Sequence, residues 1–243
     1  MSLDFLSHLE ELRRRILISL AIFFAASIVC YFFSHQILDF LIFPLRRFGN
    51  TNLFFQTPYE AFFIHIKAAA FAGLFFSSPI FFAQAWFFVS PGLYETEKRA
   101  VLPLIFISSL LFIVGAGFAY QFAIPWGLNV LLSFQTESLR PLLAIGPYFS
   151  FLVGMVLAFG ILFDFPVIIL GLVRLGVLKS TMLISFRRGI IVAIFIVAAV
   201  LTPSPDPISQ LLLAIPLYLL FEVSVVLAKW MEAKRATGEG GHG

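Results

Sequence analysis

Residues 10–33, EELRRRILISLAIFFAASIVCYFF, place two acids and three arginines directly before eighteen apolar or small residues. A helix that spans a bilayer needs about 20 mainly apolar residues, and flanking Lys and Arg on the cytoplasmic side set its orientation. The apolar run is too long for a typical cleavable secretory signal and lacks a small-residue cleavage site. The stretch therefore predicts a retained first span with its amino end in the cytoplasm.

The composition of the whole chain is that of an integral membrane protein. Of its 243 residues, 60% are hydrophobic and only 12% are charged, and the mean hydropathy is +1.01. Soluble domains carry about 25% charged residues. Because Cys30 is the only cysteine, no disulfide can form within the chain, and the redox compartment cannot be inferred from cysteine usage.

Six segments are predicted to cross the membrane as helices, which gives an all-α fold. They are residues 16–34, 68–90, 103–132, 148–173, 188–202 and 209–228. We expect a single polytopic membrane domain over 1–243, with a cytoplasmic amphipathic segment at 1–15, an interfacial helix within the loop 34–58 and a cytoplasmic tail at 229–243. No internal repeat or flexible linker divides it.

The predicted spans differ in length. The helical pattern of the second extends from Tyr59 to Val89, and that of the third from Ala100 to Phe134, with bends expected at Pro103 and Pro125. The fifth offers only thirteen residues, and we expect the fifth and sixth to be the short helices. Long helices beside short ones predict a curved, glove-like wall with thinned membrane on one flank.

Lysines and arginines are distributed unequally between the two predicted sides. Twelve lie beside the amino terminus, the carboxyl terminus and the connections after the second and fourth spans, and four lie on the other side, at Arg46, Arg47, Lys67 and Arg140. The excess on one side predicts that both termini are cytoplasmic, in agreement with an even number of spans. A multi-pass protein of the cell membrane is expected.

The charged residues at positions 10–15 have two interpretations. Ser7 and Glu10 fit a capping box, and Glu10 with Arg14, and Glu11 with Arg15, are pairs four residues apart on a helix. The segment could thus be a self-paired topology anchor. However, acids contribute little to orientation, so carboxylates at the membrane surface favour a cationic ligand.

Acidic residues elsewhere are also candidates. Glu97, with Glu95, lies in the short connection after the second span, which could equally be a solvated loop. Asp164 lies deep in the fourth span, where a lone acid is costly, so we expect it to be protonated, hydrogen-bonded or reached by water. Glu222 is expected to reach the interface or to pair with Lys229. Asp206 lies in the proline-rich turn after the fifth span.

Catalytic and metal-binding patterns are not visible in the sequence. The four histidines are scattered, and no G-x-S-x-G, Walker A or H-E-x-x-H motif occurs. We therefore expect no enzyme, no cofactor and no metal. The alternative function is a proton-coupled secondary transporter that uses Asp164, although such proteins usually show internal repeats.

Several stretches together resemble the TatC family, the large subunit of the twin-arginine protein translocase. They cover nearly the whole chain in order: HLEELRRR at 8–15, SPIFFAQAWFFVSPGLYETEKR at 78–99, FIVGAGFAYQFAIP at 112–125, AFGILFDFP at 158–166 and LTPSPDPISQLLLAIPLYLLFE at 201–222. The resemblance implies a receptor for twin-arginine signal peptides of folded cargo, which works with small single-span TatA/TatB-type subunits and uses the proton motive force.

The resemblance also implies roles for particular residues. Glu11 and Glu97 match the signal-binding acids, and Arg13 and Phe88 match residues beside them. The remaining matches are a proline of the first outer loop, two polar positions where the small partners dock and an acid of the outer turn, which are Pro44, Thr202, Gln210 and Asp206. Each arginine of a signal presents a planar fork that a carboxylate can bind at two points, and lysine lacks that geometry.

The chain departs from the family pattern at two places. The acid within the fourth span, often Glu in the family, is Asp164, whose side chain is one methylene shorter. The outer turn reads TPSPDP, with one residue more than the TPPD form of the family. A role that depends on the reach of the acid in the fourth span would therefore have to be filled by the shorter side chain of Asp164.

Overall fold

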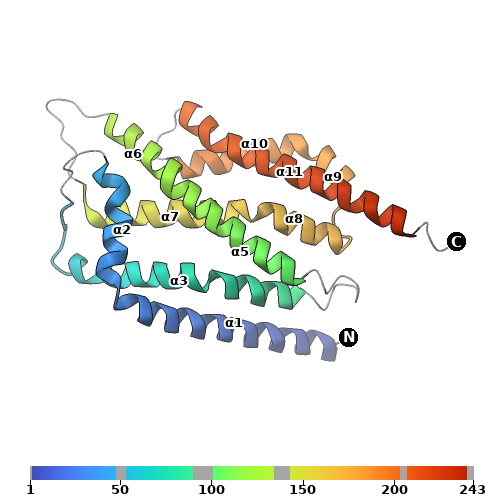
Figure 1. Ribbon diagram of the computed structural model, residues 1–243, viewed down its shortest axis with the longest axis horizontal. Helices are drawn as coiled ribbons and strands as arrows, with labels where there is room; N and C mark the ends of the chain where they lie inside the picture. The colour runs from blue at the N-terminus through green and yellow to red at the C-terminus, as the bar shows by residue number, and fades with distance from the viewer. Residues whose placement is uncertain (1, 48–52, 90–100, 134–142, 203–206, 240–243) are drawn as a thin grey trace. The chain divides into compact units, whose positions relative to one another are not determined.

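The computed structural model describes residues 2–47, 53–89, 101–133, 143–202 and 207–239, and these are almost entirely helical (Figure 1). The predicted all-α class is thus confirmed for the described part of the chain. The helices are α1 (Ser2–Tyr31), α2 (Ser34–Arg46), α3 (Glu60–Val89), α5 (Val101–Phe118), the π-helix η2 (Ala119–Ala123), α6 (Ile124–Ser133), α7 (Ile145–Phe163), α8 (Phe165–Arg174), α9 (Ser180–Ser185), α10 (Arg187–Leu201) and α11 (Pro207–Glu239).

Five stretches of the described chain are long and apolar enough to cross a membrane. They are His8–Tyr31, Glu60–Val89, Val101–Ser133, Ile145–Arg174 and Gln210–Lys234, and each contains or overlaps a predicted span. The remaining predicted span, the fifth at 188–202, corresponds to α10, which has 15 residues and therefore a length of only about 22 Å. Six spans remain a prediction. The expectation that the last span is also short was wrong, because α11 has 33 residues.

Both interruptions of long helices occur next to a proline. Pro166 has no N–H for the carbonyl of Leu162, and the chain turns at Asp164 between α7 and α8. Pro125 follows the π-helical turn η2. A π-helical turn inside an α-helix shifts the hydrogen-bond pattern, and it can thus accommodate the missing N–H of a proline. The predicted bend at Pro103 was wrong, because Pro103 lies in the first turn of α5, where a missing N–H does not disturb the helix.

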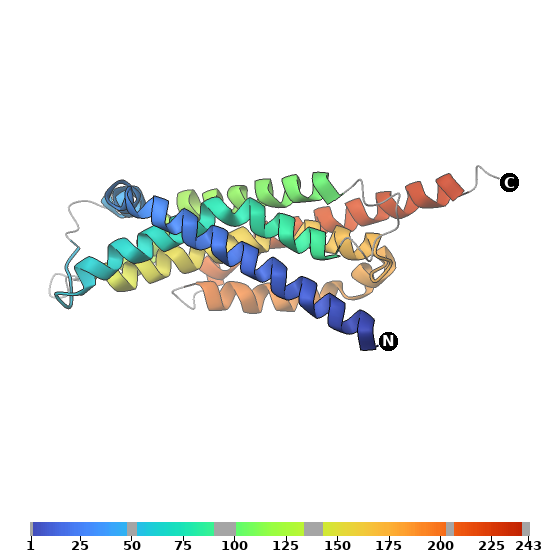
Figure 2. The same ribbon diagram turned by 90° about the horizontal axis from the view of Figure 1, so that it is seen from below.

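The chain divides into two compact units, Met1–Leu110 with Phe134–Gly154, and Leu111–Ser133 with Met155–Gly243. In the first unit α1 and α3 lie side by side, with α1 crossing α3 obliquely (Figures 1 and 2). Gly73 of α3 allows this approach, because a Cβ there would lie 2.7 Å from the backbone nitrogen of Ser27. Trp86 of α3 also donates a hydrogen bond to Ser108 of α5 over 3.1 Å.

At the other end of the first unit, α2 lies within the loop 34–58, where an interfacial helix was expected, and its place at the membrane interface stays a prediction. It begins at Ser34 and buries Leu41, Pro44 and Leu45. Tyr148 of α7 donates a hydrogen bond to the carbonyl of Leu41 over 2.8 Å. The predicted outer-loop proline, Pro44, therefore lies inside a helix and is packed there.

Glu60 connects three segments near α2. Its Oε1 accepts a hydrogen bond from the backbone N–H of Gly146 over 2.9 Å, in the first turn of α7, and its Oε2 accepts one from Gln56 over 2.6 Å. A carboxylate at the start of a helix satisfies free N–H groups and is favoured by the helix dipole. The backbone of Phe54 also pairs with residues 143 and 145.

The second unit has an apolar core made by α8, α9 and α11. Its buried members are Ile169, Val173, Leu183, Phe221, Val225 and Ala228. In the same unit α5 and α7 pack closely at two glycines, because a Cβ on Gly115 would lie 2.5 Å from the carbonyl oxygen of Phe159, and one on Gly160 would lie 2.6 Å from the ring of Phe112. Small residues of this kind let helix backbones approach in membranes.

Two glycines of α5 give a matched test of this packing. Gly115→Ala should destabilise the protein by about 1–3 kcal/mol, because the methyl group meets backbone atoms that cannot move freely. Gly117→Ala has nothing within 4 Å of the new Cβ and should be neutral or stabilise the helix by up to about 1 kcal/mol. Thermal unfolding in detergent measures both, and equal shifts for the two variants would contradict the close approach.

Candidate functional site

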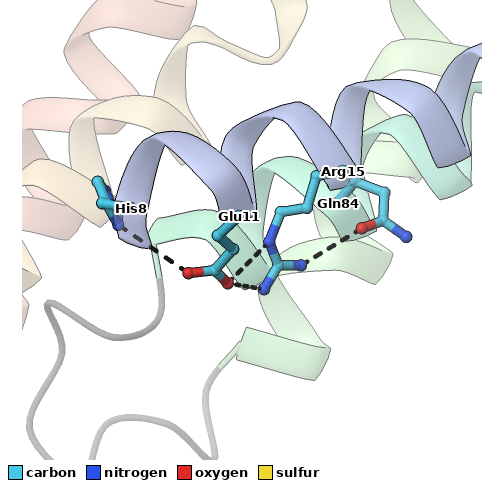
Figure 3. A network of polar contacts seen from close by, with 4 residues as sticks. All are labelled: His8, Glu11, Arg15 and Gln84. Carbon is cyan, nitrogen blue, oxygen red and sulfur yellow. Dashed lines mark hydrogen bonds and ion pairs between the residues drawn. The ribbon is translucent and has the colours of Figure 1, made fainter. Parts of the chain in front are cut away.

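The predicted ligand-binding acid Glu11 lies on α1 within a connected set of polar side chains (Figure 3). Its Oε1 accepts a hydrogen bond from Nε of Arg15 over 3.0 Å and a second from the same guanidinium. This confirms the predicted pairing of residues four apart on a helix. The side chains of Arg15 and Glu11 are 21% and 34% exposed, so the pair is half-buried.

Arg15 joins this pair to α3. Its Nη1 donates a hydrogen bond to the amide oxygen of Gln84 over 3.3 Å, and its guanidinium lies 5.9 Å from the ring centre of Phe87. The guanidinium is thus held by an acid on its own helix and by an amide and a ring on the neighbouring helix. Arginine suits such a position because it offers several donors and a face that stacks on rings.

His8 lies near the second carboxylate oxygen of Glu11, the one that Arg15 does not bind. Its Nδ1 lies 3.9 Å from Oε2 of Glu11, and its ring stacks on Phe88 of α3 with centres 4.4 Å apart. We call His8, Glu11, Arg15, Gln84 and Phe88 the Glu11 network. It includes the predicted residues Glu11 and Phe88, which are 77 positions apart in the chain.

An apolar groove of about 420 Å³ runs beside the Glu11 network between α1 and α3. Residues of both helices line it, among them Leu12, Arg15, Ile16, Phe81, Gln84 and Phe88. The groove thus places apolar surface next to the ion pair of Glu11 and Arg15. A ligand that offers cations to the carboxylate of Glu11, followed by apolar side chains, would match this arrangement.

Other predicted members of this site are placed differently. Arg13 is exposed and, two residues from Glu11, lies on another face of α1. Glu97 lies outside the described residues. The predicted pair of Glu10 with Arg14 does not form among the described residues, and both side chains are exposed. The roles of His8 and Gln84 were missed, although residues 8, 11 and 15 share one stripe of a helix.

Asp164 is buried, with 5% of its surface exposed, at the turn between α7 and α8. Its carbonyl oxygen accepts hydrogen bonds from Val167 over 3.0 Å and Ile168 over 3.2 Å. The proline at position 166 thus creates the break that places this acid between two helices instead of on a continuous helical face. The burial agrees with the expectation that an acid at this depth does not face lipid.

The polar residues Thr202 and Gln210, where α10 ends and α11 begins, are bonded to backbone carbonyls of α10. Gln210 donates a hydrogen bond to the carbonyl of Phe195 over 2.8 Å, and Thr202 donates one to the carbonyl of Ala199 over 3.2 Å. An apolar groove of about 250 Å³ begins next to Gln210, between α10 and α11. Its lining includes Ile191, Ile194, Phe195, Leu211, Ile215 and Leu219. Asp206, the acid predicted in this turn, lies outside the described residues.

The predicted pairing of Glu222 with Lys229 was wrong, because Arg187 of α10 donates to its Oε2 over 2.7 Å. Tyr218 donates to its Oε1, also over 2.7 Å. Spacing along a helix indicates only partners on α11 itself, whereas Arg187 lies 35 positions earlier in the chain. Among the described residues, no three His, Cys, Asp or Glu side chains gather in a group that could hold a metal ion.

Known proteins match both the sequence and the fold. The family model described as "Sec-independent protein translocase protein (TatC)" matches residues 7–216. The TatC protein of Magnetococcus marinus is 40% identical over 96% of this chain and 86% of its own length, and that of Aquifex aeolicus is 38% identical over 94% and 95%. A crystal structure described as "Twin Arginine Translocase Receptor- TatC in DDM" superposes with a TM-score of 0.80 at 38% identity, over 91% of this chain and 99% of that chain.

Proposed function

The chain belongs to the TatC family of Sec-independent protein translocase proteins, and from this we propose that it is the receptor and core subunit of a twin-arginine translocase. In this proposal it binds the twin-arginine signal peptides of folded cargo. Together with small single-span subunits of the TatA/TatB type, it moves the cargo across the cell membrane with the proton motive force, without catalysing a reaction itself. The alternative of a secondary transporter finds no support in these relatives.

The observation that carries the proposal is the pairing of Glu11 with a guanidinium. Arg15 already occupies the carboxylate through two nitrogens, so the site has the size and the charge for an arginine head. Charge-assisted hydrogen bonds of this kind are roughly twice as strong as neutral ones. The stacked rings of His8 and Phe88 lie beside it, and a guanidinium can also stack on such rings.

We assign the second arginine of the signal to Glu97, with Phe88 as a neighbour of the pair. For Arg13 the resemblance alone supports a role in the site, because its side chain lies on another face of α1 than Glu11. Glu97 follows α3 by eight positions, counted from Val89, and Glu11 lies against the last turns of α3 through Arg15 and Gln84. Two acids at a fixed separation would require two cations at a matching spacing. That requirement gives a selectivity beyond net charge.

Apolar side chains of the signal would then use the groove between α1 and α3. A secretory signal has a cationic segment followed by an apolar one. Along α1 the groove extends from Leu12, one position after Glu11, to Leu20, and Phe81 of α3 also lines it. The acid therefore lies at one end of the apolar groove, and this order of charged and apolar surfaces would match the order along a signal peptide.

We further propose that the outer ends of α10 and α11 dock the single-span subunits. α10 has 15 residues, too few to fill a bilayer about 30 Å thick, and the apolar groove between the two helices ends near Gln210. The amide oxygen of Gln210 makes no hydrogen bond with a residue that the structure describes. A polar group within a partner helix would find an acceptor there, because polar groups in lipid seek partners.

We also propose that the chain crosses the membrane six times, with both termini in the cytoplasm. The excess of Lys and Arg on one predicted side supports it. Cysteines introduced in place of Arg140 and Lys179 test it, with Cys30 replaced by Ser to remove the background. Residue 140 should react with a membrane-impermeant thiol reagent from outside, and residue 179 only from the cytoplasmic side. The reverse labelling would disprove this topology.

Glu97→Gln and Glu11→Gln should each weaken the binding of an Arg-Arg signal peptide by about 1.5–3 kcal/mol, because each loses one charge-assisted contact. Binding of a Lys-Lys peptide should remain about as weak as in the unmodified protein. Fluorescence anisotropy with labelled peptides measures both. Glu10→Gln, at an exposed neighbouring position without an ion pair among the described residues, is the control for the loss of one negative charge. Wild-type affinity in both test variants would refute the assignment.

Replacing Thr202 and Gln210 together by Leu should reduce the co-purification of the small subunits, because the polar docking groups are lost. Signal binding should stay intact, since the Glu11 network lies on other helices. Replacing Thr202 alone by Val keeps the shape and removes the hydroxyl, which separates the two contributions. Unchanged complex composition in the double variant would count against docking at this turn.

We propose that the buried Asp164 offers a polar contact within the membrane to a passing signal or a partner helix. Asp164→Glu should keep transport, Asp164→Asn should keep part of it, and Asp164→Leu should reduce it at an unchanged amount of protein in the membrane. Transport assays with quantified membrane protein measure this series. Normal transport by Asp164→Leu would exclude the role, and depletion of the protein would indicate that Asp164 only stabilises the fold.

A further inference from the structure

We propose that Arg15 is a built-in competitor for the arginines of a signal peptide and thereby sets the weakest signal that the receptor accepts. The inference rests on the proposed function, because it concerns the same acid, Glu11. It adds a role for a residue whose sequence pattern indicates only a topology anchor paired with Glu11.

The geometry shows a ligand-like group already in place. Arg15 contacts Oε1 of Glu11 through Nε and a terminal nitrogen, which is the type of contact that an arriving arginine would make. Both oxygens have neighbours, because Oε2 faces His8 at 3.9 Å. An arriving guanidinium can therefore bind Oε1 in this way only after Arg15 has moved away.

Arg15 has partners that do not depend on Glu11. Nη1 bonds to Gln84 on α3, and the guanidinium lies over the ring of Phe87. A displaced Arg15 therefore keeps an amide and a ring as neighbours and need not be left as a buried, unpaired charge. This lowers the cost of the exchange and distinguishes Arg15 from a residue that is fixed by a single ion pair.

The size of the effect follows from the weakness of half-exposed ion pairs. Such pairs contribute about 0.2–1 kcal/mol, so Glu11 is unoccupied in roughly one molecule in two to one in six. The apparent affinity of any ligand that must displace Arg15 falls by the same factor. Arginine signals that bind strongly tolerate this loss of affinity. Lysine signals bind the carboxylate at only one point, so the same loss leaves their affinity too low for the receptor to accept them.

A purely positioning role for Arg15 gives the opposite expectation. If Arg15 only orients the carboxylate of Glu11, its removal leaves the acid less well placed and weakens the binding of every signal. Competition instead predicts that its removal strengthens binding. The direction of the change in Kd therefore separates the two roles.

The experiment measures the Kd of labelled Arg-Arg and Lys-Lys signal peptides on the full chain in lipid nanodiscs. Arg15→Gln removes the competitor, and Arg14→Gln removes the same charge at the adjacent exposed position, so their difference excludes a general effect of charge. Arg15→Lys keeps the charge but loses the fork. Gel filtration and thermal unfolding verify that each variant is folded.

Arg15→Gln should lower the Kd of both peptides about two- to sixfold relative to Arg14→Gln, with an unchanged ratio between the peptides. Arg15→Lys should give a smaller gain. In a Glu11→Gln background the gain from Arg15→Gln should vanish, because no carboxylate is left to compete for.

A Kd for Arg15→Gln that is equal to or higher than that of Arg14→Gln would overturn the competitor role. A gain that persists in the Glu11→Gln background would overturn it as well. The proposed function fails separately, if Glu11→Gln alone leaves the binding of the Arg-Arg peptide at the wild-type level.

Discussion

Backbone polar groups inside a bilayer must be satisfied by the protein, because hydrocarbon offers no hydrogen bonds. This constraint explains why the described chain is almost wholly helical. It also explains where irregular backbone is tolerated. The turn at Asp164 is buried, and its carbonyl accepts hydrogen bonds from Val167 and Ile168. The π-helical turn that ends at Ala123 likewise has buried residues at both ends.

The same constraint extends to three acids that are tied to specific partners elsewhere in the fold. Glu60 accepts hydrogen bonds from two backbone N–H groups, Glu222 joins α10 to α11 through Arg187, and Glu232 accepts hydrogen bonds from the N–H and the hydroxyl of Ser180. Each of these acids links segments that are far apart in the chain, apart from the local contact of Glu60 with Gln56. Such pairs fix the register of neighbouring helices more than they add stability, since ion pairs gain little after desolvation.

Glu11 differs from these acids, because its main partner lies on its own helix. An intrahelical pair four residues apart is weak and reversible, and the partner, Arg15, has a second set of contacts on α3. An acid that must bind and release a cationic ligand requires this property. The groove beside it is lined by residues of both α1 and α3. Recognition of charge and recognition of apolar side chains can therefore be combined at one place.

The sequence by itself determined the all-α membrane class, the positions of most of the long helices and two candidate pairs, Glu10–Arg14 and Glu11–Arg15, because apolar length, helical period and spacing by four are local properties. It predicted the irregularity at Pro125 for the same reason. Local rules could not determine which of the two pairs would form, that Gln84 and Phe88 would meet Arg15 and His8, or that Glu222 would pair with Arg187. Those outcomes depend on which helices pack together, and that is decided by close approaches such as Ser27 against Gly73 and Phe159 against Gly115, which only the tertiary structure contains.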